Sequence, residues 1–103
     1  MTINKLKIPT SSVAIDYDVT TIGDEYKPLR LSIIFDSAPT TAESITVTIE
    51  DATHNELILS QDPVGSTIVS WTDLPPIKNG DVLNIAYANT DTRAITGVLT
   101  YEV

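Results

Sequence analysis

His54 is the only histidine of the 103-residue chain, and imidazole is the common general base near neutral pH. It lies between Thr53 and Asn55, in a segment expected to be a hairpin loop. Nucleophilic catalysis would require a hydroxyl group for His54 to polarise and a carboxylate to orient its ring. Serines are plentiful and acids lie nearby in the sequence, but no Gly-x-Ser-x-Gly elbow occurs. We therefore interpret His54 as a solvated loop residue.

Asp16 and Asp18 are two acids that a strand would place on one face. Residues two apart on a strand are separated by about 7 Å, and paired glycosidase carboxylates lie about 5 to 9.5 Å apart. The chain has only one Trp, one Phe and four Tyr, which are few for lining a sugar cleft. Carboxylates also suit calcium, but no Asp-x-Asp-x-Asp-Gly loop occurs. We expect this pair to solvate an exposed sheet face.

The amino-acid composition excludes most other kinds of catalytic, metal-binding and cofactor-binding site. The chain has no cysteine, which excludes a disulfide scaffold, a thiolate metal site and a cysteine nucleophile. A single histidine excludes the metal sites that need several imidazoles. The sequence also lacks a phosphate-binding loop, a dinucleotide fingerprint and a zinc motif. We expect no cofactor, no metal and no enzymatic activity.

The charge balance limits the class of partner. Six basic residues against fourteen acidic ones give a formal charge of −8, which argues against binding to nucleic acid or to an anionic membrane. No segment reaches the roughly 18 to 20 apolar residues of a membrane span, and the N-terminus does not resemble a signal peptide. The charge is uneven, because residues 1–7 carry two lysines and no acid. We take this as a hint that the N-terminus contacts something acidic.

Strict alternation of apolar and polar residues indicates short strands. Val13, Ile15, Tyr17 and Val19 share one face of such a segment, and Ile, Val and Thr, which favour strands, make up about a third of the chain. In the same way Leu57 and Leu59 are expected to point inward, with Ile58 opposite, and Gly97 is expected at a bulge or a close approach. Trp71 is expected in the core. The predicted strands are 13–19, 29–35, 45–49, 57–59, 67–71, 82–88 and 95–101.

Seven or eight strands at spacings of about 8 to 12 residues predict an all-β fold. We expect one antiparallel β-sandwich or jelly roll over residues 11–103, with an immunoglobulin-like topology as the alternative. Residues 1–10 are expected to form an N-terminal arm or an edge strand. Threonines should give the strands polar, uncharged outward faces that can be buried against another subunit at low desolvation cost. These are Thr46, Thr48, Thr90, Thr92, Thr96 and Thr100.

Two stretches of the sequence carry recognisable patterns of strand and turn residues. Residues 31–48 contain an expected strand, the sequence Ser-Ala-Pro-Thr-Thr, and a second expected strand. Residues 74–91 follow a Leu-Pro, Gly-Asp, Ala-Tyr-x-Asn-x-Asp pattern. Together the two stretches resemble small virion proteins of tailed bacteriophages and prophages. The resemblance covers about residues 28–103 and departs from the pattern at Asp91-Thr92-Arg93, where a glycine is expected close after the aspartate.

The resemblance implies a non-enzymatic phage structural protein that decorates or stabilises the capsid or another virion surface. Such a protein is made in the cytoplasm of the host bacterium and is then part of the virion. We expect its partners to be capsid or other virion proteins, and we expect a homo-oligomer, with a trimer as our guess. The expected anchor is the N-terminal arm, whose removal (residues 1–8) should leave the fold intact. Its partner-binding residues would be Ile3, Lys5, Leu6, Lys7 and Ile8.

A carbohydrate-binding or host-adhesion module on a jelly-roll scaffold is the alternative function. In that case Trp71 and either Tyr87 or Tyr101 would stack on sugar rings. This alternative predicts at least two aromatic side chains exposed together on one face or rim.

Overall fold

The alternating segments form eight strands in a computed structural model, which describes residues 2–20, 22, 25–51 and 55–103. Within these residues there is no helix, and hence none long and apolar enough to cross a membrane. The strands are β1 (Ile3–Ser11), β2 (Ile15–Val19), β3 (Lys27–Phe35), β4 (Ile45–Glu50), β5 (Asn55–Gln61), β6 (Ile68–Trp71), β7 (Val82–Tyr87) and β8 (Ile95–Glu102).

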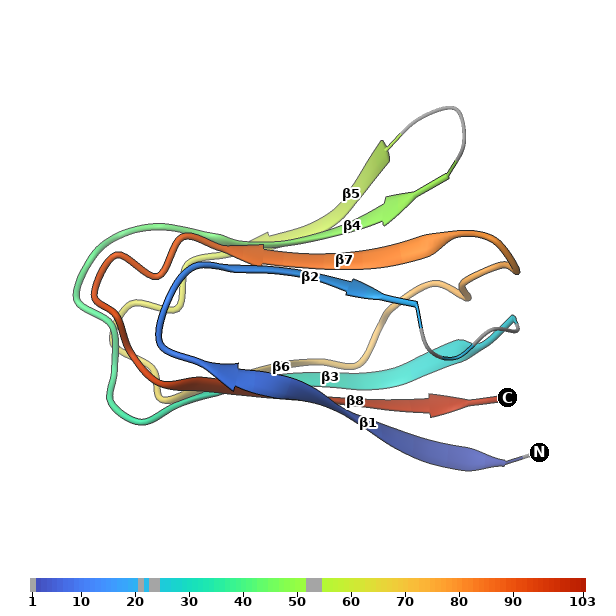
Figure 1. The fold of residues 1–103 in the computed structure, drawn as a ribbon, viewed down its shortest axis with the longest axis horizontal. Helices are drawn as coiled ribbons and strands as arrows, with labels where there is room; N and C mark the ends of the chain where they lie inside the picture. Colours follow the sequence, from blue (N-terminus) through green and yellow to red (C-terminus); the bar gives the residue numbers. More distant parts are fainter. Residues whose placement is uncertain (1, 21, 23–24, 52–54) are drawn as a thin grey trace.

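Two four-stranded antiparallel sheets pack face to face (Figure 1). Sheet A has the order β1-β8-β3-β6, and sheet B has the order β2-β7-β4-β5. β1 therefore pairs with β8, β2 with β7, β3 with β6 and β4 with β5. This is the pairing obtained when one long antiparallel ribbon is rolled up, and it makes the predicted β-sandwich a jelly roll rather than an immunoglobulin-like fold.

The core lies between the sheets and uses the inward positions that alternation predicted. Fully buried side chains come from both sheets and from the segment between β6 and β7. That segment contains Pro75 and Pro76 and is not a strand, as expected. Its Ile77 forms an isolated bridge with Tyr26, which closes one end of the sandwich. The largest fully buried aliphatic side chains are Leu31, Ile45, Ile77, Leu83, Ile85, Ile95 and Leu99.

Gly97 marks a close approach of β8 to its neighbours, and an irregularity in the pairing of β1 with β8 begins directly beyond it, between Ile8 and Ser11. Gly97 faces inward and pairs with Ile8 of β1 and Ile33 of β3. A Cβ at this position would lie 2.7 Å from Ile8 Cδ1 and 3.1 Å from Ile33 Cδ1. Only glycine leaves room for both isoleucines at this level of the core.

Three details of the predicted faces are wrong. Val13 precedes β2 and is 66% exposed, so it does not belong to the inward set. The register shifts between Val47 and Thr48, so that Ile58 is an extra residue in β5 and Leu57 turns outward with 59% exposure. Thr90 and Thr92 lie in the turn after β7 rather than on a strand.

Residues 3–11 form an edge strand and not a free arm. β1 pairs with β8 from Ile3↔Glu102 to Ser11↔Ile95. Ile8 is only 2% exposed and belongs to the core, and Leu6 packs against that core. Removing residues 1–8 would therefore damage the fold, which corrects the expectation that the rest of the domain survives this deletion.

Candidate functional site

The residues first considered for catalysis are not assembled into a catalytic group in the described part of the chain. His54 falls outside the described residues. Asp16 and Asp18 are exposed on the outward side of β2, where both accept hydrogen bonds from the Asn84 amide, at 2.6 and 2.7 Å. Asn84 lies between them from β7 and is only 8% exposed. The Asn84 amide thus fixes both aspartate side chains on the outward surface of sheet B.

No group of three or more His, Cys, Asp or Glu side chains that could hold a metal occurs among the described residues. The acids among the described residues are instead distributed over the sheet surface and the loops. Two of them, Asp91 and Glu43, accept hydrogen bonds from neighbouring loops and so have a structural role.

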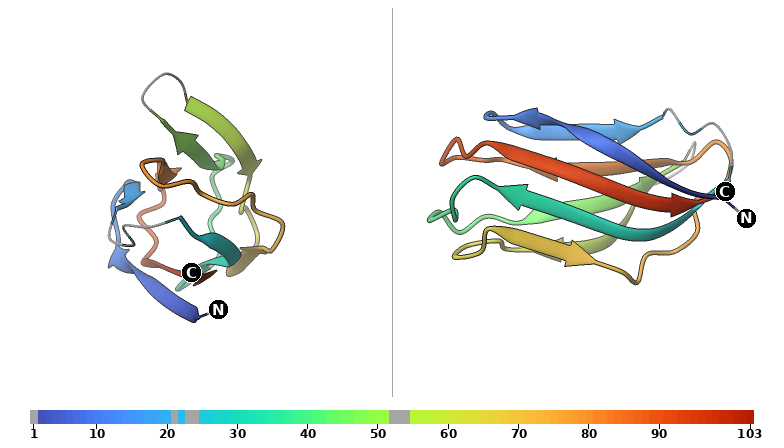
Figure 2. Two further views of the ribbon diagram at one scale, coloured as in Figure 1. Left: turned by 90° about the vertical axis from the view of Figure 1, so that its right-hand side faces the viewer. Right: turned by 90° about the horizontal axis from the view of Figure 1, so that it is seen from below.

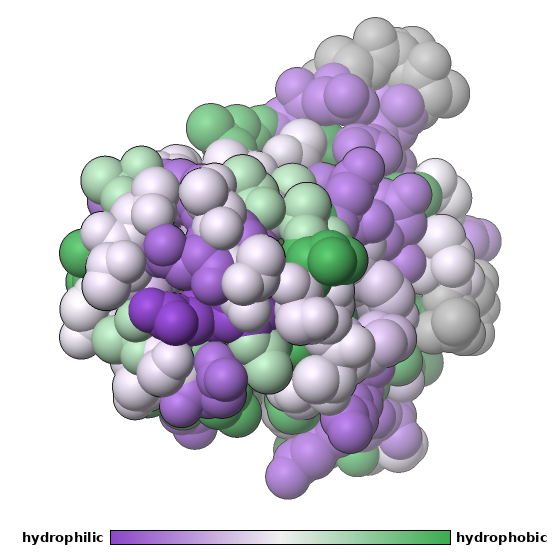
Figure 3. Space-filling view, turned by 60° about the vertical axis from the view of Figure 1, so that its left-hand side comes forward, coloured by the Kyte–Doolittle hydropathy of each residue, from purple (hydrophilic) through white to green (hydrophobic). Residues whose placement is uncertain are grey.

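The loop end of the sandwich, at the left of Figure 1, brings together the two stretches on which the family resemblance rests. Asp91 accepts hydrogen bonds from Thr40 N at 2.7 Å, Thr41 N at 2.8 Å and Thr41 Oγ1 at 2.7 Å. The hydrogen bonds from Thr41 and Thr40 lower the pKa of Asp91 to about 2. Glu43 in turn accepts from Thr90 N and Thr90 Oγ1. Figure 3 shows hydrophilic residues gathered on this end among residues of intermediate hydropathy.

Thr92 explains why a glycine is expected after Asp91. Its φ is +54°, in the left-handed region that a β-branched residue rarely adopts. Asn89 adopts a similar φ of +53° and is buried, with its amide nitrogen donating to the carbonyl groups of Val13 and Arg93. The motif residues therefore shape the turns at this end.

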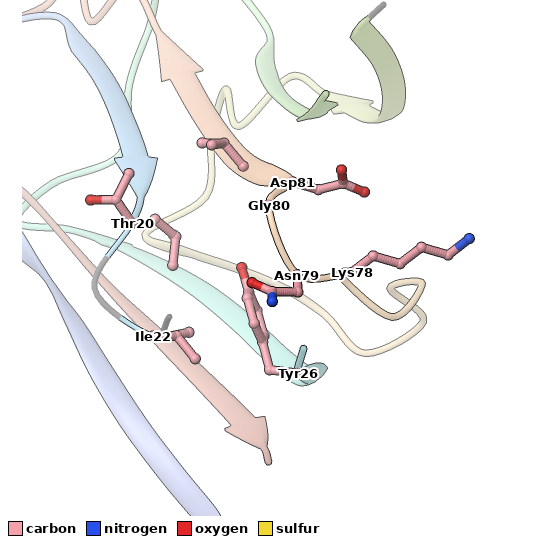
Figure 4. Close-up of a pocket in the computed structure, with 9 residues that line it drawn as sticks. Thr20, Ile22, Tyr26, Lys78, Asn79, Gly80 and Asp81 are labelled. Atoms are coloured by element: carbon pink, nitrogen blue, oxygen red, sulfur yellow. The ribbon is translucent and has the colours of Figure 1, made fainter. Parts of the chain in front are cut away.

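A hollow of about 210 Å³ lies at the opposite end, between the end of β2 and the turn that precedes β7 (Figure 4). The Tyr26 hydroxyl is buried without a protein hydrogen-bond partner, and burial raises its pKa to about 12. The phenol is therefore neutral at physiological pH. Lys78 and Asp81 also border the hollow, but Figure 4 shows their charged groups directed away from Tyr26. The volume is below the roughly 300 to 1,000 Å³ of typical ligand pockets.

The three aromatic residues considered for sugar stacking are not exposed together. Trp71 packs partly against the core, and its indole nitrogen donates to Gln61 Oε1 at 2.8 Å, joining the edge strands β6 and β5. Tyr101 is half-buried and packs edge-on against Tyr26. Tyr87 is 4% exposed and packs edge-on against Phe35.

The five residues predicted to bind a partner divide between the two sides of β1. Ile3, Lys5 and Lys7 are exposed on the outward side of sheet A. Leu6 and Ile8 point inward and pack in the core, so they are not available to a partner. Sequence reasoning thus located the strand but assigned both of its sides to binding.

The outward side of sheet A collects most of the positive charge of the chain. Its strands contain four of the six basic residues and a single acid, Glu102. The rest of the chain holds two bases and thirteen acids. We call this side the basic face, and its charged residues are Lys5, Lys7, Lys27, Arg30 and Glu102.

Between its charges the basic face is apolar or weakly polar. Ile34 and Ile68 are paired neighbours, exposed by 42% and 52%, and Ile3 is 61% exposed. Ser32 and Ser70 hydrogen-bond to each other across strands at 3.0 Å. Because such hydroxyls already have a protein partner, covering them costs less than covering a charged group.

The outward side of sheet B has the opposite charge. Its four strands contain no Lys or Arg. The charged residues that point outward are Asp16, Asp18 and Glu50, and the exposed Leu57 lies in the same row as Asp18. We call this side the acidic face.

Sequence reasoning did not find either face as a whole. Lys27 and Arg30 lie on β3, more than twenty residues from Lys5, and β8 separates the two strands in the sheet.

A comparison with protein-family models gives no match for this chain, and a comparison with curated proteins gives none either.

Proposed function

We propose that this chain is a non-enzymatic structural subunit of a tailed-phage virion. In this role it decorates or stabilises the capsid or another virion surface through protein–protein contacts. The observation that carries the proposal is the basic face. It combines exposed isoleucines, hydroxyl side chains and four basic residues on one sheet of an acidic protein.

The chemistry of this face suits a protein partner. Exposed apolar side chains that lie together mark interaction surfaces more often than isolated ones do. Ile34 and Ile68 lie side by side, and the row Lys7, Val98, Ser32, Ser70 crosses the whole sheet beside them. The basic residues would direct the face toward an acidic protein surface.

The fold is compatible with the proposal but does not decide it. Jelly rolls occur in viral capsid proteins and also in lectins, and a fold alone does not determine a function. The resemblance of residues 28–103 to phage virion proteins favours the first group. The arrangement of Trp71, Tyr87 and Tyr101 does not favour the second, since no two of them form an exposed stacking platform.

Mass spectrometry of purified phage particles tests the role. The gene is deleted from the bacterium that carries it, and a plasmid then supplies either the wild-type gene or a variant. Phage particles are purified from each of these strains. The wild-type protein is expected to co-purify with particles in many copies. Its recovery only in the soluble lysate would refute a virion role.

Two single substitutions with the same charge change test the face itself. Lys7→Glu lies on the basic face, whereas the control Lys78→Glu lies in the connection between β6 and β7. We expect Lys7→Glu to lower the number of particle-bound copies by about tenfold, since a reversed charge at an interface costs on the order of 1.4 kcal/mol or more. Equal losses for the two variants would show that the face is not the contact.

A further inference from the structure

The two faces of the sandwich match each other in charge and in position. β1 and β2 are the edge strands of sheets A and B, and residues 12–14 join them directly. Both strands therefore lie along the same side of the sandwich, as the right-hand view of Figure 2 shows. The lysines of β1 and the aspartates of β2 thus border opposite faces on the same side of the molecule.

We infer that the basic face binds the acidic face of a second copy of this chain, head to tail. The inference rests on the proposed docking role of the basic face and names its partner. When copies are stacked in the same orientation, β1 of one copy lies over β2 of the next. Lys5 and Lys7 then face Asp16 and Asp18.

The spacing of the charges agrees with this arrangement. Lys5 and Lys7 are two residues apart on one side of β1, and Asp16 and Asp18 are two residues apart on one side of β2. Both pairs are therefore separated by about 7 Å along their strands. The hydrogen bonds from Asn84 hold the two aspartates in place and use one oxygen of each carboxylate. The Oδ2 atoms of the two carboxylates take no part in those two hydrogen bonds and face the lysines in the stacked arrangement.

The uncharged parts of the faces also fit a contact between copies. Leu57 gives the acidic face an exposed apolar residue, and the isoleucines of the basic face provide apolar surface opposite it. Pairing either face with itself would bring like charges together, so a twofold dimer through one face is disfavoured. A contact between two different faces is heterologous, and it forms a ring or an open stack depending on the rotation between copies.

Sedimentation of the purified protein at low and high salt tests the inference. The wild type is expected to associate at about 10 mM salt, where the screening length is about 30 Å, and much less at about 1 M, where it is about 3 Å. A monomer at every concentration at low salt would overturn the inference. Association that high salt strengthens would also overturn it.

Charge-swapped variants then identify the two faces. The first variant carries Lys5→Glu and Lys7→Glu, and the second carries Asp16→Lys and Asp18→Lys. Each alone should lose self-association by at least about tenfold, because like charges then meet. Mixed in equal amounts, they should associate again, since the altered faces of the two variants are complementary to each other.

Matched controls keep the result interpretable. Lys78→Glu and Asp73→Lys change charge on exposed residues outside both faces and are expected to associate like the wild type. Circular dichroism and thermal melting check the fold of each variant, and Glu50→Lys replaces the Asp16 and Asp18 variant if that variant is unfolded. Folded swap variants that stay monomeric when mixed would overturn the inference. Because only purified protein is used, this failure is distinct from absence of the protein from phage particles.

Discussion

The two faces of this sandwich are built from the same kind of strand but carry opposite charges. The strands of sheet A contain four basic residues and one acid, whereas those of sheet B contain acids and no base. Their inward sides are interchangeable aliphatic surfaces that share one core. The difference between the outward sides is therefore not required by folding, and this is the reason to look for partners there.

Deletion of residues 1–8 is the largest change, because it removes part of the basic face together with core residues. Ile8 is only 2% exposed, and the burial of this one side chain contributes about 1.5 to 3 kcal/mol to the free energy of unfolding. The deletion also leaves β8 as an unpaired edge strand. We expect the melting temperature to fall by at least about 10 °C, or cooperative unfolding to be lost. Thermal melting followed by circular dichroism measures this. A wild-type melting temperature would restore the free-arm interpretation.

Gly97→Ala tests the packing of the inward side of sheet A, which lies behind the basic face. The new Cβ would lie 2.7 Å from Ile8 Cδ1 and 3.0 Å from Ile8 Cβ, so Ile8 must move. Such overpacking costs about 1 to 3 kcal/mol of the free energy of unfolding, measured by urea denaturation. Thr100→Ala, on the outward side of the same strand, is the control and should change stability by less than about 0.5 kcal/mol. Similar effects at both positions would mean that the two sides of β8 do not differ in packing.

Asn84→Asp tests how the acidic face holds its negative charge. The Asn84 amide donates to both Asp16 and Asp18, and an aspartate there would place three carboxylates together. We expect a loss of about 1 to 2 kcal/mol at neutral pH, from the lost hydrogen bonds and the added repulsion. Asn79→Asp adds the same charge in an exposed turn and should be nearly neutral. If both variants are equally stable, the amide does not stabilise the aspartate pair.

Asp91→Asn is expected to have a smaller effect and to leave both faces unchanged. The pKa of Asp91 is lowered from 3.8 to about 2 in the folded protein, so its ionised form stabilises the fold above the unfolded pKa. The wild type should therefore melt at a higher temperature than the variant above about pH 4. This difference should shrink as the pH falls and vanish near pH 2. A difference independent of pH would show that the charge of Asp91 is not involved.

The sequence predicted the strands well because alternation is a local property. Inward positions such as Ile33, Ile85 and Leu99 follow directly from it and are buried. Leu57 is an exception, since the extra residue Ile58 shifts the alternation by one position in β5. No local pattern specifies such a shift.

The two faces and the strand order depend on pairing between strands that lie far apart in the sequence. The alternation of apolar and polar residues within one strand does not specify that pairing. Ile3 pairs with Glu102, almost the full length of the chain away. The two N-terminal lysines give the sequence an uneven charge, but Arg30 joins them on one face only because β8 pairs with both β1 and β3. Asn84 lies on an outward position of β7, yet it is only 8% exposed and donates hydrogen bonds to Asp16 and Asp18 of the neighbouring β2. The sequence of β7 alone does not specify this contact.

Carbodiimide coupling of the purified protein tests the central claim most directly, because it joins a lysine amine to a carboxylate only when the two groups touch. An equal mixture of ¹⁴N- and ¹⁵N-labelled protein distinguishes links between copies from links within one copy. The account predicts mixed-isotope peptides that join Lys5 or Lys7 to Asp16 or Asp18 at low salt and not at high salt. Mixed-isotope links that involve only Lys78, or no links between copies at all, would contradict it.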